Sequence, residues 1–438
     1  MEELRKVSIN KQSNKFEYIM YPEDIVKLLH SDNNDFVETG IKAIRNYYKY
    51  YNFDFNDPIQ VDFLQFVQQL LNSSDTSQIE TGHKVLKSIS KKIKEYELLE
   101  PFLDIIFNQI ETFPSNISIF ATKSLIYFAK FETLSFRIIN KNYIGVIESI
   151  FRNDEIQIET KLDFLKFSFD VISKILSHYD LISQLQDYIK SFITFSALVF
   201  YTCNELCLNI LRCINSIIKT TSIYDSAFKA DEIDIDLNAF IEEEINDSNK
   251  EIVCLSLNSL YYYYLRGNNS VNSSFLRMVE LIAHPDCDIC LNALLACQGL
   301  VHSSAKTYEI LGNVGLYDNL FHVFEKGNIS SKRAGLPIIR TIVKKEDQNA
   351  IMELYNSGVF TSLCNFFNSS LQVYIIIYMI EIFDFFFKAE INIGESLPAR
   401  QIFYDQGCLD VLAELYDSDN MKLSEFSLFL KETYFNDV

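Results

Sequence analysis

The sequence contains no tryptophan and few residues that interrupt helices, with 12 glycines and 7 prolines in 438 residues. Glycine and proline disfavour helix interiors because glycine is conformationally free and proline lacks a backbone donor. At the same time, 48% of the residues are apolar. This composition favours long helices joined by short turns.

The chain is also poor in positive charge. It has 39 Lys and Arg residues against 59 Asp and Glu residues, which gives a net charge of −20 and a pI of about 4.8. A nucleic-acid-binding domain is more often basic, so we expect no direct contact with nucleic acid. An acidic surface favours basic partners or simply keeps a protein in solution, and the composition leaves both interpretations open.

Long hydrophobic runs are missing as well. The longest run without a charge, FITFSALVFYTCN at 192–204, falls short of the roughly 20 apolar residues that a membrane-spanning helix needs. The run VYIIIYMI at 373–380 is followed by Glu381 and Asp384, which is typical of a buried helix. We expect no membrane contact.

The nine cysteines show no disulfide spacing, and no signal peptide is evident, so we expect a reducing compartment. The nearest approach to a metal motif is HPDCDIC at 284–290, where two residues separate Cys287 from Cys290. A zinc site needs a second pair of ligands, and Cys297 is the nearest candidate. We expect no metal, and we interpret these cysteines as small buried residues on helices.

No group of residues suggests catalysis. The stretch GNVG at 312–315 lacks the lysine that follows a phosphate-binding loop, and no GxSxG or HExxH motif occurs. The six histidines are scattered along the chain. We expect no enzymatic activity and no cofactor.

Three glycines precede similar apolar patterns. After Gly315 and Gly358, apolar residues stand at offsets 1, 2, 5, 8 and 9, and a closely related set follows Gly407. These offsets give a helix one apolar face, and a glycine before the helix allows a turn at positive φ. The glycines are separated by 43 and 49 residues, and a period of roughly 40–47 residues is typical of armadillo and HEAT arrays.

The same offsets start after Asp62, Pro101 and Asn142, at steps of 39 and 41 residues. Each short helix precedes a polar turn and a longer expected helix, at 73–96, 153–176, 246–267 and 284–304. One such unit cannot bury its apolar faces alone, so neighbours must stack. We therefore expect an all-α solenoid whose long third helices line one concave groove. The acidic segment at 217–252 is either an irregular repeat or a surface extension.

Two terminal segments resemble importin-α. Residues 23–71 are similar to the first armadillo repeat of that family, whose closing motif resembles LQFVQQLL at 64–71. Residues 388–435 are similar to the last repeat, which ends on an aromatic pair like Tyr434 and Phe435. The resemblance implies a right-handed superhelical armadillo or HEAT-like solenoid of about ten repeats over residues 21–438. It also implies a short, degenerate basic segment at 1–20.

Importin-α proteins are nuclear import adaptors. The resemblance therefore implies a protein of the cytoplasm and nucleus that binds cargo localisation signals in its groove. Importin-β would bind the N-terminal segment through its cations, Arg5, Lys6, Lys11 and Lys15. The attraction would be weak, because an exposed ion pair contributes roughly 0–1 kcal/mol.

The groove of the family carries a Trp and, four residues later, an Asn on each third helix. In matching register these positions fall on Lys84 and Ser88, Lys123 and Tyr127, Leu211 and Asn215, and Leu295 and Gly299, so that only Asn215 keeps the family's residue. Tyrosines at 261–264 could replace the missing Trp, because aromatic faces attract cations. The groove candidates are Lys84, Lys123, Tyr127, Leu211, Asn215, Tyr261 and Tyr263.

Lysines gather on one expected third helix, at 84, 87, 91, 92 and 94. They either repel a basic signal peptide or lie on a solvated face.

The alternative function is an armadillo or HEAT scaffold, or an assembly chaperone, with no transport role. Its groove would accept partners that are not basic.

Overall fold

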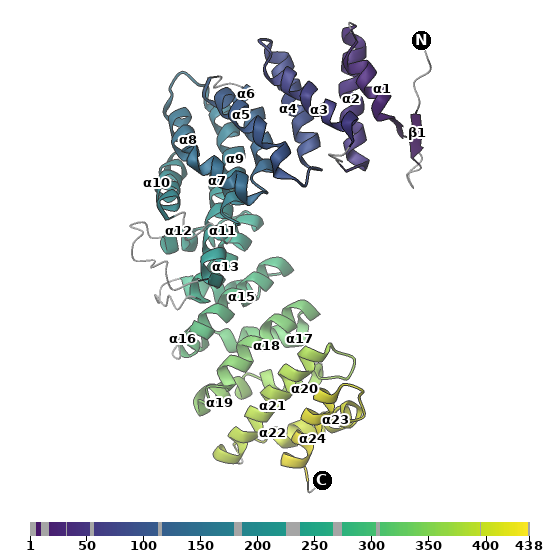
Figure 1. Cartoon of the computed structure of the whole chain (residues 1–438). Coiled ribbons are helices and arrows are strands. Elements are labelled where there is room, and N and C mark those ends of the chain that lie inside the picture. Colours follow the sequence, from purple (N-terminus) through teal and green to yellow (C-terminus); the bar gives the residue numbers. More distant parts are fainter. Residues whose placement is uncertain are drawn as a thin grey trace. The chain divides into compact units, whose positions relative to one another are not determined.

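The structure, a computed structural model, consists of helices apart from one β-hairpin (Figure 1). It describes residues 6–9, 17–31, 33–52, 57–112, 116–178, 186–224, 237–265, 274–303, 307–394 and 396–436. The chain divides into two compact units, unit 1 at 1–216 and unit 2 at 217–438. Both are stacks of helices of the kind found in an α-solenoid, which confirms the predicted fold class at that level.

The hairpin corrects the prediction of a purely helical chain. Strand β1 (Lys6–Ile9) pairs antiparallel with β2 (Glu17–Met20), with Val7 opposite Ile19. Their sequences, KVSI and EYIM, are rich in β-branched and aromatic residues, which favour strands. Of the four expected importin-β-binding cations, Lys6 lies in β1, whereas Arg5, Lys11 and Lys15 lie outside the described residues.

In unit 1, one helix of each repeat packs on the corresponding helix of the next repeat, and we call these the long helices. Its long helices are α2 (Asn34–Tyr50), α4 (Thr76–Ser90), α6 (Asn116–Phe128) and α9 (Ile158–Ile175), and α11 (Cys207–Tyr224) continues into unit 2. The other elements are α1 (Pro22–Leu29), α3 (Pro58–Leu71), η1 (Tyr96–Leu98), α5 (Glu100–Thr112), α7 (Glu132–Asn140), α8 (Tyr143–Arg152), α10 (Gln186–Thr202) and η3 (Asn204–Leu206).

Unit 2 repeats this packing. Its long helices are α13 (Lys250–Leu265), α15 (Cys287–Ser303), α18 (Ile329–Val343), α21 (Val373–Ile393) and α24 (Met421–Tyr434). The shorter ones are α12 (Leu237–Glu244), α14 (Ser274–Ile282), α16 (Thr307–Asn313), α17 (Leu316–Lys326), α19 (Gln348–Asn356), α20 (Val359–Phe366), α22 (Ala399–Asp405) and α23 (Cys408–Tyr416). Within the acidic segment, α12 packs on α13, as expected of an irregular repeat.

The predicted glycine corners are confirmed. Gly315, Gly358 and Gly407 precede α17, α20 and α23 at φ of 94°, 84° and 70°. Asn142 stands at the same place before α8 with φ of 52°, in the left-handed region that Asn tolerates better than most residues. The corner therefore survives in a repeat that has no glycine there.

Long helices pack directly on long helices in each unit. In unit 1 the order of contact is α2, α4, α6, α9, and in unit 2 it is α13, α15, α18, α21, α24. A Cβ on Gly40 of α2 would stand 2.9 Å from Cδ2 of Leu29, and one on Gly82 of α4 would stand 2.9 Å from Cδ2 of Leu71. The same close approach thus recurs after 42 residues, which indicates one packing geometry used twice.

Hydrogen bonds also connect neighbouring repeats at the ends of the long helices. Lys130, after α6, donates to the backbone oxygens of Ser90 (2.9 Å) and Ile93 (2.5 Å) at the end of α4. His178 Nε2 donates to the oxygen of Ala129 at 2.7 Å, and Lys345 donates to that of Val301 at 3.0 Å. Cationic donors favour helix C-termini, where carbonyls have no partner within the helix.

The chain closes on the aromatic pair noted in its sequence. Tyr434 and Phe435 are both buried, with ring centroids 5.2 and 5.4 Å from that of Phe387. The Tyr434 hydroxyl donates to Asp384 Oδ1 at 2.7 Å. The last helix therefore covers the apolar face that α21 would otherwise expose.

We expect Gly315→Ala to lower the free energy of unfolding by about 1–2 kcal/mol, because a Cβ is strained at positive φ. Nothing lies within 4 Å of the position that this Cβ would take, so strain is the only cause. Gly315→Asn, which copies Asn142, should lose less stability. Urea unfolding measures both, and equal losses for Ala and Asn would contradict the explanation.

Candidate protein-binding surface

Three consecutive long helices of unit 1 carry a concentration of positive charge. We define the basic face as Lys42, Arg45 and Lys49 of α2, Lys84 and Lys87 of α4, Lys91 and Lys92 just after α4, and Lys123 of α6. No acidic residue occurs at 39–53, 81–94 or 113–131. In a chain of net charge −20, this separation of charge gives the basic face a local potential that attracts anions.

Helical spacing places the α2 residues together. Lys42, Arg45, Asn46 and Lys49 stand at offsets 0, 3, 4 and 7, which is one face of a helix. The opposite face of α2 is buried through Ala43, Ile44 and Tyr48, and it fixes the orientation of the charged face. The Tyr48 hydroxyl donates to Gln60 Oε1 at 3.1 Å, and burial raises its pKa above the usual range.

A buried polar network holds α4. The imidazole of His83 is 1% exposed, with Nε2 at 2.7 Å from Gln109 Oε1 and Nδ1 at 3.2 Å from Ser124 Oγ. Gln109 Nε2 donates to the backbone oxygen of Leu71 at 2.6 Å. One histidine thereby connects α4 to α5 and α6 and, through Gln109, to the end of α3. Burial lowers its pKa to about 4, so the ring is neutral at physiological pH.

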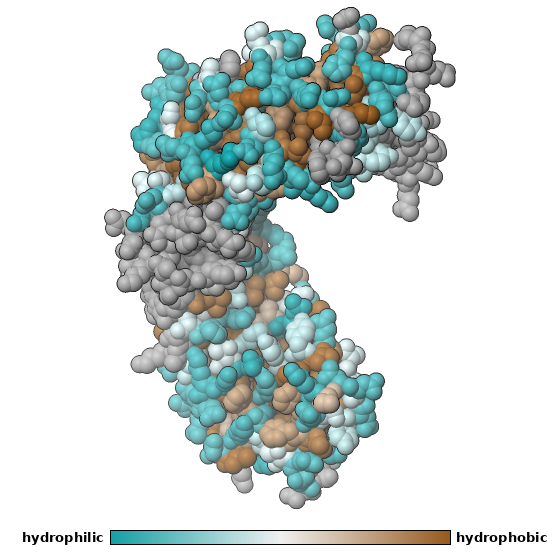
Figure 2. All heavy atoms as spheres, in the orientation of Figure 1, coloured by the Kyte–Doolittle hydropathy of each residue, from teal (hydrophilic) through white to brown (hydrophobic). Residues whose placement is uncertain are grey.

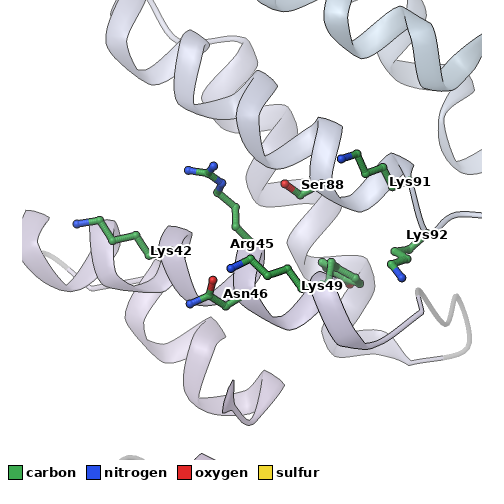
Figure 3. A pocket seen from close by; sticks show the side chains of 8 residues that line it. Lys42, Arg45, Asn46, Lys49, Ser88, Lys91 and Lys92 are labelled. Carbon is green, nitrogen blue, oxygen red and sulfur yellow. The ribbon is translucent and has the colours of Figure 1, made fainter. Parts of the chain in front are cut away.

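A pocket opens between α2 and the end of α4. It has a volume of about 680 Å³ and is lined by Lys42, Arg45, Asn46, Tyr48, Lys49, Ser88, Lys91 and Lys92. Figure 3 shows Lys42, Arg45 and Lys49 along α2 and Ser88 on the neighbouring α4, which ends just before Lys91 and Lys92. Among the described residues, Lys42 pairs with Glu38 at 3.5 Å between two well-exposed side chains, and no carboxylate pairs with Arg45, Lys49, Lys91 or Lys92.

Farther along the basic face, lysines lie over aromatic rings of the chain itself. The Lys123 ammonium is 4.1 Å from the ring centroid of Phe167 and 5.2 Å from that of Phe120. Lys84 lies 5.1 Å from the Phe120 ring, and Lys91 lies 5.4 Å from the Tyr127 ring. Cation–π attraction holds these lysines on the surface. The faces of these rings are therefore already in contact with lysines of the chain itself.

The cations repel one another. Burial lowers the pKa of Lys87, and so do Lys91, Lys123 and Arg45. An anion placed among these cations would be attracted by several of them at once. The basic face ends at α9, where half-buried Asp170 lies near Arg212 and burial raises its pKa above the usual value.

Several predicted groove residues lie on this surface. Lys84, Lys123 and Tyr127 are half-buried side chains of adjacent helices, and Lys84 is also paired with Glu80. Asn215 is half-buried on α11. Leu211 is 0% exposed, so its side chain packs in the core and is not available to a peptide. The register that placed Leu211 in the groove is therefore wrong for α11, where Arg212 is the half-exposed neighbour.

The two predicted tyrosines lie on α13 in unit 2. Tyr261 and Tyr263 are half-buried, and the ring of Tyr261 meets that of Tyr262 edge-on at 4.9 Å. A Cβ on Gly299 would stand 2.7 Å from the Tyr261 backbone oxygen, so α13 and α15 approach closely here. The neighbouring Tyr262 ring lies 5.9 Å from the Lys219 ammonium.

Unit 2 uses a related arrangement with a balancing acid. Arg340 of α18 lies 4.8 Å from the ring centroid of Tyr378 and forms an ion pair with Glu381. Tyr378 and Glu381 are both on α21. Arg333 lies 5.6 Å from the Tyr374 ring. Glu381 thus neutralises one of these two arginines, whereas Arg45, Lys49, Lys91 and Lys92 of unit 1 have no carboxylate partner among the described residues.

Sequence reasoning missed Lys42, Arg45 and Lys49, as well as the rings of Phe120 and Phe167. The signal for the α2 cations was present in their helical spacing and in the absence of acids at 39–53. The two phenylalanines gave no signal, because aromatic residues are frequent throughout this chain and most of them are core.

Other classes of site find little support in the described residues. No group of three or more His, Cys, Asp or Glu side chains there could hold a metal ion. Cys290, from the HPDCDIC stretch, is buried with Sγ 3.7 Å from Ser331 Oγ. Within the same part of the chain, every helix is too short or too polar to cross a bilayer. Figure 2 shows hydrophilic residues over much of the visible surface of each unit.

Comparison with known proteins defines the fold only. No protein-family model and no curated protein matches the chain. Among solved structures, it is similar to the crystal structure of an engineered protein from the Northeast Structural Genomics Consortium. The TM-score is 0.65 at 12% sequence identity, over 94% of this chain and 98% of that one. The helical stack is thus a known architecture, reached by a very different sequence.

We expect unit 1 to lose stability as the pH falls from 6.5 to 4. The folded pKa of His83, about 4, lies below its ordinary value of 6.5. Its contribution is therefore complete above pH 6.5 and is lost toward pH 4, by roughly 3 kcal/mol in total. Urea unfolding at several pH values measures this loss. A His83→Gln variant with the same pH dependence as the wild type would exclude His83 as the cause.

We expect Lys87→Gln to stabilise the protein, by about 0.2–0.5 kcal/mol from relief of the Lys87–Lys91 repulsion alone. The effect should shrink in high salt, because salt screens exposed charges. The control is Lys94→Gln, at an exposed lysine outside the basic face. Thermal unfolding at two salt concentrations measures both variants, and a destabilised Lys87→Gln would show that this lysine has a favourable partner.

Proposed function

We propose that this chain is an adaptor of nuclear import with an armadillo-type superhelix of about ten repeats. Ten helices of the described residues stand where the last helix of a repeat is expected, and they support that number: α2, α4, α6, α9, α11, α13, α15, α18, α21 and α24. In this proposal the protein moves between cytoplasm and nucleus, holds a linear segment of a cargo protein and binds importin-β through residues 1–20. It contacts neither nucleic acid nor membrane directly.

The observation that carries the proposal is the direct packing of long helices on one another, from α2 through α4 and α6 to α9 in unit 1 and from α13 through α15, α18 and α21 to α24 in unit 2. Within a unit, such packing puts the outer faces of successive helices side by side, about 8–10 Å apart. Side chains from several helices then meet one bound segment at regular intervals. Lys84, Lys91 and Lys123, which touch rings on adjacent helices, occupy such positions.

A scaffold or assembly chaperone without a transport role is the second candidate, and the basic face favours it. A basic localisation signal would be repelled by the positive charges on α2, α4 and α6. The aromatic rings that could attract its lysines already have lysines of the chain over them. Unit 1 would therefore select partners other than the basic signals that a groove with free aromatic rings and acids receives. Binding to importin-β separates the two candidates.

The import proposal predicts that purified importin-β binds the full chain and that deletion of residues 1–20 weakens binding at least about tenfold. Four ion pairs at roughly 0–1 kcal/mol each can supply that difference. A pull-down followed by titration measures it. The matched control replaces Arg5, Lys6, Lys11 and Lys15 with Gln, which keeps the chain length and should lose affinity as well. Absence of binding by the full chain would leave the scaffold as the function.

A further inference from the structure

We propose that the basic face of unit 1 binds an extended segment of a partner protein that is rich in Asp and Glu. This inference rests on the proposed role of the long-helix faces in protein binding, and it adds the chemical class of the partner. The import adaptor and the scaffold both accommodate it. It assigns to unit 1 a ligand of opposite charge to a basic localisation signal.

The first argument is uncompensated charge at a formed cavity. Five cations, Lys42, Arg45, Lys49, Lys91 and Lys92, line one pocket of about 680 Å³, together with Asn46 and Ser88 as neutral hydrogen-bonding groups. Four of these five cations have no carboxylate partner among the described residues, and Glu38 reaches Lys42 at 3.5 Å only. Carboxylates entering this pocket would gain charge-assisted hydrogen bonds.

The second argument is the shape of the charged area. Beyond the pocket it continues to Lys87 and Lys84 on α4 and to Lys123 on α6, so it crosses three helices in sequence. One helix-to-helix step of 8–10 Å corresponds to about three residues of an extended chain. A linear polyanion matches this spacing, whereas a compact anion would reach the pocket and leave Lys123 unused.

The third argument favours a peptide over RNA. Single-stranded nucleic acid is held by base stacking on aromatic rings in addition to its phosphates. Here the rings of Phe120 and Phe167 already have the ammonium group of Lys123 close to them, at 5.2 and 4.1 Å. A net charge of −20 would also repel a long polyanion beyond the basic face. The single arginine among eight cations gives little bidentate recognition of phosphate, so carboxylates match the site as well as phosphates do.

The test is a fluorescence-anisotropy titration of the full chain with labelled 12-residue probes. These are a Glu/Asp-rich peptide, the same peptide with Gln and Asn in place of the acids, a Lys-rich peptide and a single-stranded RNA. We expect the acidic peptide to bind at least tenfold more tightly than the other three. Its affinity should fall markedly between 50 and 200 mM salt, because the contacts are exposed ion pairs.

Paired variants locate the binding. Arg45→Glu with Lys91→Glu should weaken the acidic peptide at least tenfold. The control, Lys326→Glu with Lys344→Glu, makes the same charge change at exposed lysines of unit 2 and should stay within twofold of wild type. If the first pair alters folding, as read by circular dichroism, Arg45→Gln with Lys91→Gln replaces it and should lose affinity by a smaller factor.

Two results would overturn the inference. One is equal binding of the acidic and neutral peptides, and the other is tighter binding of RNA than of the acidic peptide. Failure here is distinguishable from failure of the import proposal. Importin-β binding without acidic-peptide binding would remove only this inference, whereas acidic-peptide binding without importin-β binding would remove only the transport role.

Discussion

The structure depends on one constraint, which is that a two- or three-helix repeat buries its apolar faces only against the next repeat. Long-range hydrogen bonds of the described residues follow it, because they join residues about one repeat apart. Lys130 reaches Ser90 at a separation of 40 residues, Lys345 reaches Val301 at 44, and Tyr434 reaches Asp384 at 50. Lys130 and Lys345 thereby cap helix ends of a neighbouring repeat, and the aromatic pair Tyr434 and Phe435 covers an apolar face of α21.

The same constraint creates the candidate site. Long helices that must pack on one another leave their remaining faces side by side, so the charges of different repeats are added on one surface. On α2, α4 and α6 these charges are positive, and burial together with their repulsion lowers the pKa of Lys87. Cation–π contacts to Phe120, Tyr127 and Phe167 offset part of that repulsion. The cations without a carboxylate partner among the described residues are concentrated in the pocket between α2 and the end of α4, and one of them, Lys91, also lies over the Tyr127 ring.

The contrast between the units bears on the resemblance to importin-α. Both units place cations over aromatic rings of the next repeat, but Arg340 in unit 2 also has Glu381 as a partner. On the basic face, lysines of the chain itself lie over the aromatic rings. A groove that binds a basic signal instead leaves its aromatic rings and acidic side chains free to contact the lysines of that signal. The terminal similarities of sequence and the chemistry of the basic face therefore point to different partners, and a chain can combine a transport role with a cargo surface of its own.

The sequence by itself determined the helical repeat. Glycine corners at 315, 358 and 407, the apolar offsets after them and the buried run at 373–380 are local patterns, and local patterns decide where helices begin and which face is buried. The charged helix with lysines at 84, 87 and 91 was visible too. Only the tertiary structure decided that Arg45 and Lys91 line one pocket, that Lys123 lies over the Phe167 ring, that Leu211 is core and that β1 pairs with β2. These facts depend on the rotation of each helix against its neighbour and on pairing between distant segments. A rotation by one residue exchanges buried and exposed positions without changing the periodicity that the sequence displays.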